Sequence, residues 1–314
     1  MRSILMANQI LKMSAPDLLR DLDLTDDELL YLLDLADGVK RAPREYAHAL
    51  DGKAIAMLFE KPSLRTKLTF ELAIRQLGGD SLFMEGPIGV REPLKDVARN
   101  LERWVNGIVA RVFAQTTVED LAQWSTVPVI NALSDAYHPC QALADVQTIR
   151  ERFGQLKGLK LTFVGDGNNV AQSLMLTAMR LGMDFALACP EGYLPNPDVV
   201  AQSEGLAAVS GSTLLVTHDA EKALDGAHAV YTDVWASMGQ EQEAVIRRKE
   251  FRSYQVNDEL FARARPDAVF MHCLPAKRGE ETTDSIMEHE RSVVFDQAEN
   301  RLHAQKALLL MMLS

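Results

Sequence analysis

Two hydroxyl side chains and an arginine are concentrated in the segment Lys61-Pro62-Ser63-Leu64-Arg65-Thr66. The apolar run Ala54 to Phe59 before it predicts a buried strand, and the apolar spacing after it predicts a helix. The segment is therefore expected at a helix N-terminus, where free backbone N–H groups and the helix dipole attract anions. The Arg65 guanidinium adds a fork suited to phosphate. In a second interpretation, Ser63 only caps the helix and Arg65 is a solvated surface charge.

A second group of polar residues, His138-Pro139-Cys140-Gln141, is predicted to open another helix after an apolar strand. His138 and Gln141 can donate hydrogen bonds, so both are candidates to polarise a carbonyl oxygen on which negative charge develops. A histidine taken in isolation is more often a hydrogen-bonded structural residue.

In the second half of the chain, Gly165-Asp166-Gly167-Asn168-Asn169 joins a predicted strand to a helix. The glycine turn superficially resembles a dinucleotide-binding fingerprint. However, Val170 stands at the third glycine position and no convincing acidic residue follows about 20 positions later, so this interpretation is weak. Asn169 at the helix start is instead a candidate to hold a carboxylate.

Asp233 and Cys273 each follow a further predicted strand. Ligands of open α/β sheets bind at the carboxyl ends of strands, so the two residues can face one crevice. A carboxylate there favours a ligand cation, and the thiol can contact an amine. For either residue alone, a helix cap for Asp233 and a small buried hydrophobe for Cys273 are the more common roles.

These candidate residues lie in a chain of alternating strands and helices, which predicts an α/β fold with two doubly wound parallel-sheet domains and a cleft between them. Strands are predicted at Ala54–Phe59, Gly107–Phe113, Val127–Ala132, Leu159–Val164, Phe185–Ala188, Thr213–Thr217, Ala229–Tyr231 and Ala268–His272. Helices are predicted at Asp27–Lys40, Thr66–Leu77, Thr117–Trp124 and His138–Arg152. We expect domains at residues 1–150 and 151–298, with the terminal helix 299–314 packing back onto the first.

Composition excludes several functional classes. The 314 residues carry a net charge of -11, which disfavours binding to nucleic acid or anionic membranes. No apolar tract approaches the roughly 20 residues of a membrane helix, and no signal-peptide pattern opens the chain. Three widely spaced cysteines suit a reducing compartment and lack metal-ligand spacing. We therefore expect a cytoplasmic protein without a metal or cofactor.

Taken together, these segments resemble the aspartate/ornithine carbamoyltransferase family, and in particular its ornithine carbamoyltransferases. The resemblance spans nearly the whole chain. It is carried by Phe59 to Thr66, Asp96 to Arg99, Ala110 to Val112, His138 to Gln141, Gly165 to Asn169, Asp233 to Gly239, His272 to Pro275 and Glu299 to Arg301.

The resemblance implies an enzyme that transfers the carbamoyl group of carbamoyl phosphate to the side-chain amine of L-ornithine, giving L-citrulline and phosphate. It implies a homotrimer or an assembly of trimers. The residues implied to hold carbamoyl phosphate are Ser63, Leu64, Arg65, Thr66, Arg111, His138, Gln141, Cys273, Leu274 and Arg301. Those implied to hold ornithine are Asn169, Asp233, Ser237 and Met238, and those implied to be catalytic are Arg65, Arg111, His138 and Cys273.

Three positions depart from the family pattern. Leu64 replaces a common Thr but keeps its backbone N–H for phosphate, so little loss is expected. Lys67 replaces the usual Arg and cannot form a planar bidentate pair. Around Pro87, some relatives carry a Gln that reaches a neighbouring subunit's substrate, a contact that this chain lacks.

Other functions remain open at this point. Putrescine has no α-carboxylate, so as the acceptor it would leave Asn169 without a partner. An acylated ornithine has no free α-ammonium group and would leave Asp233 unpaired. Aspartate carries a second carboxylate, which would require additional cationic residues. A nucleotide-dependent dehydrogenase is suggested only by the glycine turn. A catalytically silent family member is disfavoured by the presence of Arg65, His138 and Cys273.

Overall fold

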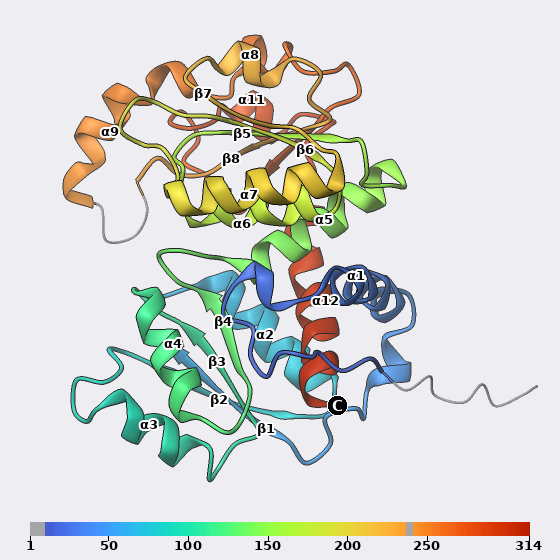
Figure 1. Cartoon of the computed structure of the whole chain (residues 1–314), viewed down its shortest axis with the longest axis vertical. Helices are drawn as coiled ribbons and strands as arrows, with labels where there is room; N and C mark the ends of the chain where they lie inside the picture. The colour runs from blue at the N-terminus through green and yellow to red at the C-terminus, as the bar shows by residue number, and fades with distance from the viewer. Residues whose placement is uncertain (1–9, 237–240) are drawn as a thin grey trace, which may run out of the picture.

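The computed structural model describes residues 10–236 and 241–314. They form two lobes, each built on a parallel sheet (Figure 1). The first sheet has the order β2-β1-β3-β4 and contains β1 (Ala54–Phe59), β2 (Asp80–Glu85), β3 (Gly107–Arg111) and β4 (Val129–Leu133). The second has the order β7-β6-β5-β8-β9 and contains β5 (Lys160–Val164), β6 (Asp184–Ala188), β7 (Leu214–Thr217), β8 (Ala229–Thr232) and β9 (Val269–His272). The prediction of two parallel α/β sheets is confirmed.

Helices surround both sheets. The first lobe contains α1 (Asp26–Arg41), α2 (Leu64–Gln76), α3 (Leu94–Leu101) and α4 (Gln115–Trp124). The second contains α6 (Asn169–Arg180), α7 (Pro197–Ser210), α8 (Ala220–Leu224), α9 (Ala244–Glu250), α10 (Asp258–Phe261) and α11 (Asp284–Met287). None of the helices in the described ranges is long and apolar enough to cross a membrane.

Local sequence signals explain where several helices begin and end. Thr25 and Glu28 form a capping box at the start of α1, each side chain bonding to the other's backbone N–H. The helix α5 (Pro139–Phe153) has proline in its first turn and ends at Gly154, whose φ of 75° suits a residue without a side chain. These signals define the first residue of α1 and both ends of α5, the helix that carries Gln141.

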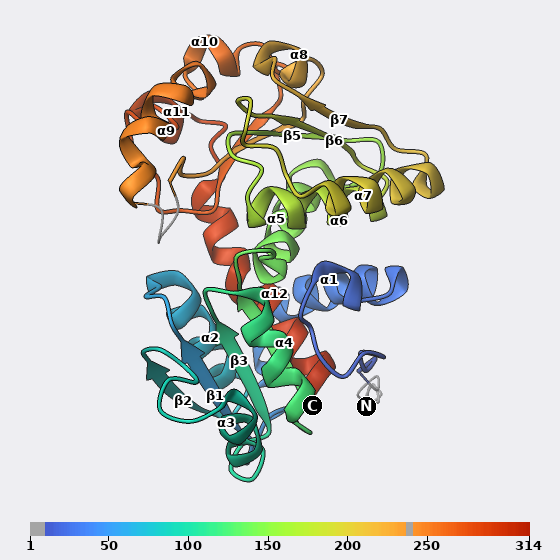
Figure 2. The same ribbon diagram turned by 60° about the vertical axis from the view of Figure 1, so that its left-hand side comes forward.

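Two long helices, α5 and α12, connect the lobes. The terminal helix α12 (Val294–Leu313) packs against α1, α2 and α5 and also reaches β9 (Figure 2). It begins five residues earlier than the predicted 299, and the added turn carries Gln297. Because α12 touches elements of both lobes, residues near the C-terminus can contribute to a site in the first lobe.

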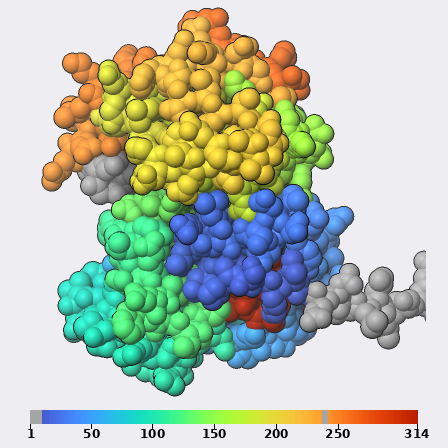
Figure 3. All heavy atoms as spheres, viewed as in Figure 1, coloured from blue at the N-terminus to red at the C-terminus, as the bar shows by residue number. Residues whose placement is uncertain are grey.

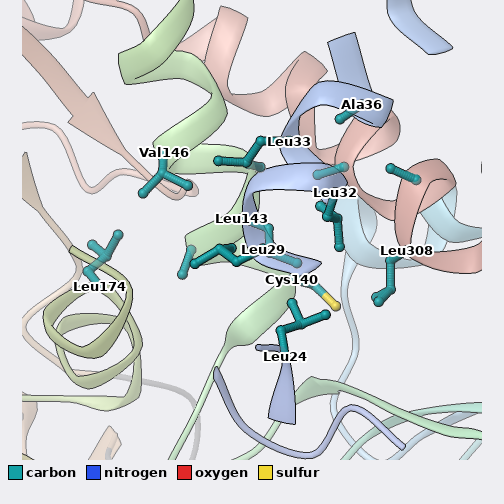
Figure 4. Packing of buried hydrophobic residues seen from close by; sticks show 14 of the residues in the cluster. Leu24, Leu29, Leu32, Leu33, Ala36, Cys140, Leu143, Val146, Leu174 and Leu308 are labelled. Atoms are coloured by element: carbon teal, nitrogen blue, oxygen red, sulfur yellow. The ribbon is translucent and has the colours of Figure 1, made fainter. Parts of the chain in front are cut away.

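One hydrophobic core runs through both lobes. Leucines of α1 and α12 meet Cys140, Leu143 and Val146 of α5 and Leu174 of α6, all with less than a tenth of their surface exposed (Figure 4). On the face seen in Figure 3, atoms of the second lobe meet those of the N-terminal segment without a separating linker. This continuous packing holds the strand ends of the two sheets in a defined relation.

Candidate active site

The candidate residues lie at the carboxyl ends of strands where the strand order reverses. In the first sheet β1 and β3 are neighbours, and they lead into the segment 61–66 and into Arg111. In the second sheet β5 and β8 are neighbours, and they lead into the segment 165–169 and into Asp233. This reversal point is where open α/β sheets bind ligands.

The start of α2 has the geometry of an anion site. Ser63 is the N-cap, and its hydroxyl accepts a hydrogen bond from the Thr66 backbone N–H at 3.2 Å. Leu64 and Arg65 follow in the first turn, where N–H groups lack partners within the helix. Ser63 therefore caps the helix, and this cap is compatible with an anion bound at the helix terminus.

Two buried arginines converge on one hydroxyl. The Thr66 Oγ1 accepts from Arg301 at 2.9 Å and from Arg111 at 3.4 Å, although Arg301 comes from α12. Burial and the neighbouring Arg301 lower the pKa of Arg111 to about 10. The Nε atoms of both arginines are buried and lack hydrogen-bond partners among the described residues.

With Arg65, these residues form a group of three guanidiniums that we call the arginine cluster. Within residues 10–236 and 241–314, none of the three pairs with a carboxylate side chain. Burying charge without a counterion is unfavourable, so the arrangement calls for an anionic ligand. A phosphate or another oxyanion would provide that counterion.

His138 lies beside the arginine cluster as a neutral ring. It is the N-cap residue of α5, and its backbone N–H donates to the Ser173 hydroxyl at 2.9 Å. Burial, with the charges of Arg301 and Arg111, lowers its pKa well below the usual value. Its Nδ1 is buried without a partner in the described part of the chain. A neutral imidazole of this kind can exchange a hydrogen bond with a ligand without adding charge.

Gln141 is oriented differently from the donor role expected of it. Its Nε2 donates to Asp145 at 2.8 Å, and its Oε1 accepts from Arg301 at 2.5 Å. The side chain therefore presents an oxygen, rather than N–H groups, to the arginine cluster.

In the second lobe, Asp233 is a buried carboxylate that already has hydrogen-bond donors. It accepts from Asn168 Nδ2 at 2.9 Å, from the Cys273 thiol at 3.0 Å and from the Val234 backbone N–H at 2.8 Å. Sequence analysis did not single out Asn168, although an Asn immediately before a helix is a recognisable capping signal. Its Oδ1 indeed caps α6 while its Nδ2 orients Asp233.

Asn169 ties the second lobe to the loop that carries His138. Its Nδ2 donates to the Ser134 carbonyl at 2.6 Å, and Gln172 of the same helix donates to the Ala136 carbonyl at 2.8 Å. Because Ser173 also holds the His138 backbone, the first turns of α6 fix this loop at three points.

Cys273 is a protonated thiol. Burial, followed by the charge of Asp233, raises its pKa well above the usual range, and the S–H donates to Asp233. The next residue, Leu274, has a φ of 59°, which is unusual for a residue other than glycine. Its backbone N–H donates to His272 Nδ1 at 2.8 Å. The strand end is thus held in one conformation by local contacts.

Asp233, His272 and Cys273 lie close enough together to be considered as a metal site. However, His272 Nδ1 accepts from Leu274, while Nε2 faces Glu281 at 3.1 Å. Because both ring nitrogens are engaged and the thiol keeps its proton, this group offers no set of free metal ligands.

The two halves of the site face each other. Burial lowers the pKa of Arg65, and the nearby Asp233 carboxylate opposes that shift. The segments after β1 and β8 therefore share one region, although they come from different sheets. Ser237 and Met238 lie outside the described residues.

The glycine turn after β5 is closed to a nucleotide phosphate. A Cβ placed on Gly167 would lie 2.3 Å from the Pro195 backbone nitrogen, so another chain segment occupies the approach. Asp166 pairs with Arg247 at 2.6 Å, and both are largely buried. The glycine is needed for close packing between loops, which disfavours the dehydrogenase interpretation.

Two buried residues of the network were missed by sequence analysis. Asp145 and Gln297 lie one turn from Gln141 and Arg301, respectively, and contact each other at 2.7 Å. The available signal was a polar side chain one turn from another candidate residue on the same helix, but the contact joins residues 152 positions apart.

Comparisons with known proteins agree with this geometry. The model of the aspartate/ornithine carbamoyltransferase carbamoyl-P binding domain matches residues 16–151, and that of the Asp/Orn binding domain matches residues 157–312. An ornithine carbamoyltransferase from Thermococcus kodakarensis is 51% identical over 305 residues, covering 96% of this chain and 97% of its own. An anabolic ornithine carbamoyltransferase from Pyrococcus furiosus is 50% identical, with the same coverage.

Solved structures agree as well. The structure of ornithine carbamoyltransferase from Pyrococcus furiosus superposes with a TM-score of 0.93 at 49% identity, covering 97% of this chain and 99% of that one. An N-acetyl-L-ornithine transcarbamylase has a TM-score of 0.86 at 32% identity, covering 94% and 99%.

Proposed function

The chain belongs to the aspartate/ornithine carbamoyltransferase family, and we propose that it transfers the carbamoyl group of carbamoyl phosphate to the side-chain amine of L-ornithine, giving L-citrulline and phosphate. One observation carries this proposal. The arginine cluster, without a carboxylate partner among the described residues, lies at the start of α2 and faces the buried carboxylate Asp233. An anionic donor and a cationic acceptor can therefore meet there.

In this proposal, the phosphate of the donor binds the backbone N–H groups at the start of α2. Ser63, Leu64, Arg65 and Thr66 hold the phosphate, while Arg111, His138 and Arg301 surround the carbamoyl group. Gln141, Cys273 and Leu274 complete the donor site. Positive charge around the carbamoyl oxygen makes the carbon more electrophilic and stabilises the oxyanion that forms during attack.

The acceptor binds from the second lobe. Asp233 pairs with the α-ammonium group and Asn169 with the α-carboxylate, which directs the side-chain amine toward the donor. Ser237 and Met238 contribute to ornithine binding by family resemblance. The fixed positions of Asp233 and Asn169 support this assignment, since orientation of two bound reactants is a major source of rate enhancement.

The reaction needs no covalent enzyme intermediate. The neutral amine attacks the carbamoyl carbon, a C–N bond forms and the C–O bond to phosphate breaks. The amine proton leaves with the phosphate, which is released as the C–O bond breaks and accepts it. Cys273 keeps its proton and assists as a neutral neighbour that orients Asp233 and the amine, rather than as a nucleophile.

The choice of acceptor is tested by measuring carbamoylated product with ornithine, putrescine, aspartate and N-acetylornithine. We expect citrulline formation to exceed the other products by orders of magnitude, because only ornithine combines an α-ammonium group for Asp233 and an α-carboxylate for Asn169 with a second amine that can react. Faster turnover of N-acetylornithine would overturn the assignment of Asp233 to the α-ammonium group.

The proposed donor-binding domain covers residues 1–150, and the ornithine-binding domain covers residues 151–298. The terminal helix 299–314 returns to the first domain, which its packing against α1 and α2 supports. The three cysteines are unpaired, which supports a cytoplasmic location.

We further propose that the protein is a homotrimer. Leu64, Leu68 and Leu72 form an exposed apolar stripe along α2. This stripe begins in the phosphate-binding loop, so a second copy placed on it would lie beside the site. Leu68→Glu should lower the mass measured by light scattering, whereas Val209→Glu, at a position 87% exposed on α7, should not. A trimer that survives Leu68→Glu would contradict this interface.

A further inference from the structure

Asp145 is a buried carboxyl group that the proposed mechanism does not use. It lies on α5, one turn after Gln141, and is fully buried. Its Oδ1 accepts from Gln141 Nε2 at 2.8 Å and from Gln297 Nε2 at 2.7 Å. Its Oδ2 has no hydrogen-bond partner in the described ranges. One oxygen atom therefore accepts from both amides.

This contact and the one to Arg301 together determine which end of the Gln141 amide faces the arginine cluster, because a guanidinium can only donate. A side-chain amide has a donor end and an acceptor end, and its partners decide its orientation. Asp145 draws the nitrogen toward itself, so the oxygen points to Arg301, from which it accepts at 2.5 Å. A carbonyl oxygen has two lone pairs, and the second can accept from an N–H group of a ligand.

Asp145 is itself held from the second lobe. Gln297 on α12 accepts from the His272 backbone N–H at 2.9 Å, and its Nε2 also donates to the Tyr231 hydroxyl at 3.1 Å. The Gln297 amide therefore cannot rotate without breaking contacts to β8 and β9. Burial raises the pKa of Asp145 to about 7, but a proton on Oδ2 leaves Oδ1 free to accept in either state.

We propose that Asp145 is a positioning residue that sets donor specificity, because it turns the Gln141 oxygen toward the NH₂ of a carbamoyl group. This inference rests on the proposed function. Acetyl phosphate has the same phosphate and carbonyl groups but a methyl group in place of NH₂. A hydrogen-bond-accepting oxygen at that position favours carbamoyl phosphate, whose NH₂ can donate to it. With acetyl phosphate the same oxygen is left without a hydrogen bond.

The test compares two donors and two substitutions. The KM for carbamoyl phosphate is measured in citrulline formation, and acetyl phosphate is measured as a competitive inhibitor. Asp145→Leu removes the acceptor and should raise the KM for carbamoyl phosphate about tenfold, with the acetyl phosphate inhibition constant nearly unchanged. Asp145→Asn keeps an oxygen at the Oδ1 position and should retain the wild-type ratio of the two constants.

Thr148→Val is the matched control for a buried change between α5 and α12. Thr148 lies on α5, one turn after Asp145, and its hydroxyl accepts from Asn300 Nδ2 at 2.9 Å. It has no hydrogen bond to Gln141 or Asp145. We expect this variant to lose stability but to keep the donor ratio. The melting temperature of each variant is measured alongside the kinetics.

Three outcomes would overturn the proposal. They are equal weakening of both donors in Asp145→Leu, loss of the ratio in Asp145→Asn, and an altered ratio in Thr148→Val. If Asp145→Leu does not fold, Gln141→Met tests the same acceptor and should show the same selective loss. A failure of the proposed function is distinct, because the wild-type protein would then form no citrulline from carbamoyl phosphate and ornithine.

Discussion

The two halves of the active site differ in how their charges are satisfied. In the first lobe, Arg111 and Arg301 are buried with unpartnered Nε atoms, and no described carboxylate side chain pairs with them. In the second lobe, Asp233 is already paired with Asn168 and Cys273. The first-lobe half therefore needs a negative charge from the ligand, whereas the carboxylate of the second-lobe half already has hydrogen-bond donors within the protein.

This difference predicts different consequences of mutation. The attraction between the buried guanidiniums and the ligand becomes stronger as negative charge develops on the ligand. The arginine cluster should therefore mainly stabilise the transition state. In the proposed mechanism Asp233 contacts a part of the acceptor that does not react, so it should act mainly on binding. The four predictions below test this division, beginning with the largest expected effect.

Arg65→Ala should lower kcat/KM by about 100- to 1000-fold, because Arg65 is proposed to hold the phosphate that gains negative charge as it leaves, and a preorganised donor to developing charge is commonly worth roughly 2.7 to 4 kcal/mol. Steady-state citrulline formation measures the effect. The expected loss lies chiefly in kcat, since the contact strengthens during the reaction.

Arg75→Ala is the control for Arg65→Ala, because Arg75 is an exposed arginine near the other end of the same helix. It should leave turnover unchanged. Near-normal turnover of Arg65→Ala, with an unaltered melting temperature, would remove Arg65 from the mechanism and with it the contrast between the halves.

Asp233→Asn should raise the KM for ornithine roughly 10- to 100-fold, since hydrogen bonds to charged groups contribute about 1.5 to 3 kcal/mol. The KM for carbamoyl phosphate should change little. Kinetics with each substrate varied in turn separates the two constants. An unchanged KM for ornithine would show that the α-ammonium group binds elsewhere.

The fold was predictable where burial leaves a simple pattern. The run Ala54–Phe59 was predicted with its observed bounds, because a central strand covered on both faces is apolar throughout. The edge strand β2 was missed, since its apolar run is only Leu82-Phe83-Met84 between polar residues, and Leu82 and Met84 are themselves exposed. Such a pattern lacks the continuous burial that identified the other strands.

The site was predictable where a residue acts through its own segment. Ser63 and Arg65 follow from the strand-loop-helix pattern, which already implies a helix N-terminus. Asp145 and Gln297 could not be predicted in this way, because their roles exist only after α5 and α12 pack together. The orientation of Gln141 escaped prediction for the same reason, since it depends on those two neighbours.

Asp145 joins the two halves and gives the stability of the protein a pH dependence. Its folded pKa of about 7 exceeds the ordinary 3.8, so between these values the folded state holds a proton that the unfolded state has released. The free energy of unfolding should therefore fall as pH rises, by at most about 1.4 kcal/mol per pH unit from this group.

Denaturant unfolding of wild type and Asp145→Asn at pH 5, 6 and 8 measures this effect. The Asn variant lacks this titrating group. The free energy of unfolding of the variant minus that of wild type should therefore increase from pH 5 to pH 8. Asp21, whose pKa burial raises to about 6, remains in both proteins and cancels in the difference. A difference that does not vary with pH would show that Asp145 titrates normally.

Lys67, a departure from the family pattern, should matter least. Its Nζ lies 3.6 Å from the centre of the Phe83 ring, which gives the lysine a cation–π partner on β2 in place of a salt bridge. Lys67→Ala should lower the free energy of unfolding by about 0.5 to 1 kcal/mol and leave kcat nearly unchanged. Lys67→Arg should keep the ring contact and the stability. A loss of turnover in Lys67→Ala comparable to that of Arg65→Ala would instead show that Lys67 acts in the reaction together with the arginine cluster.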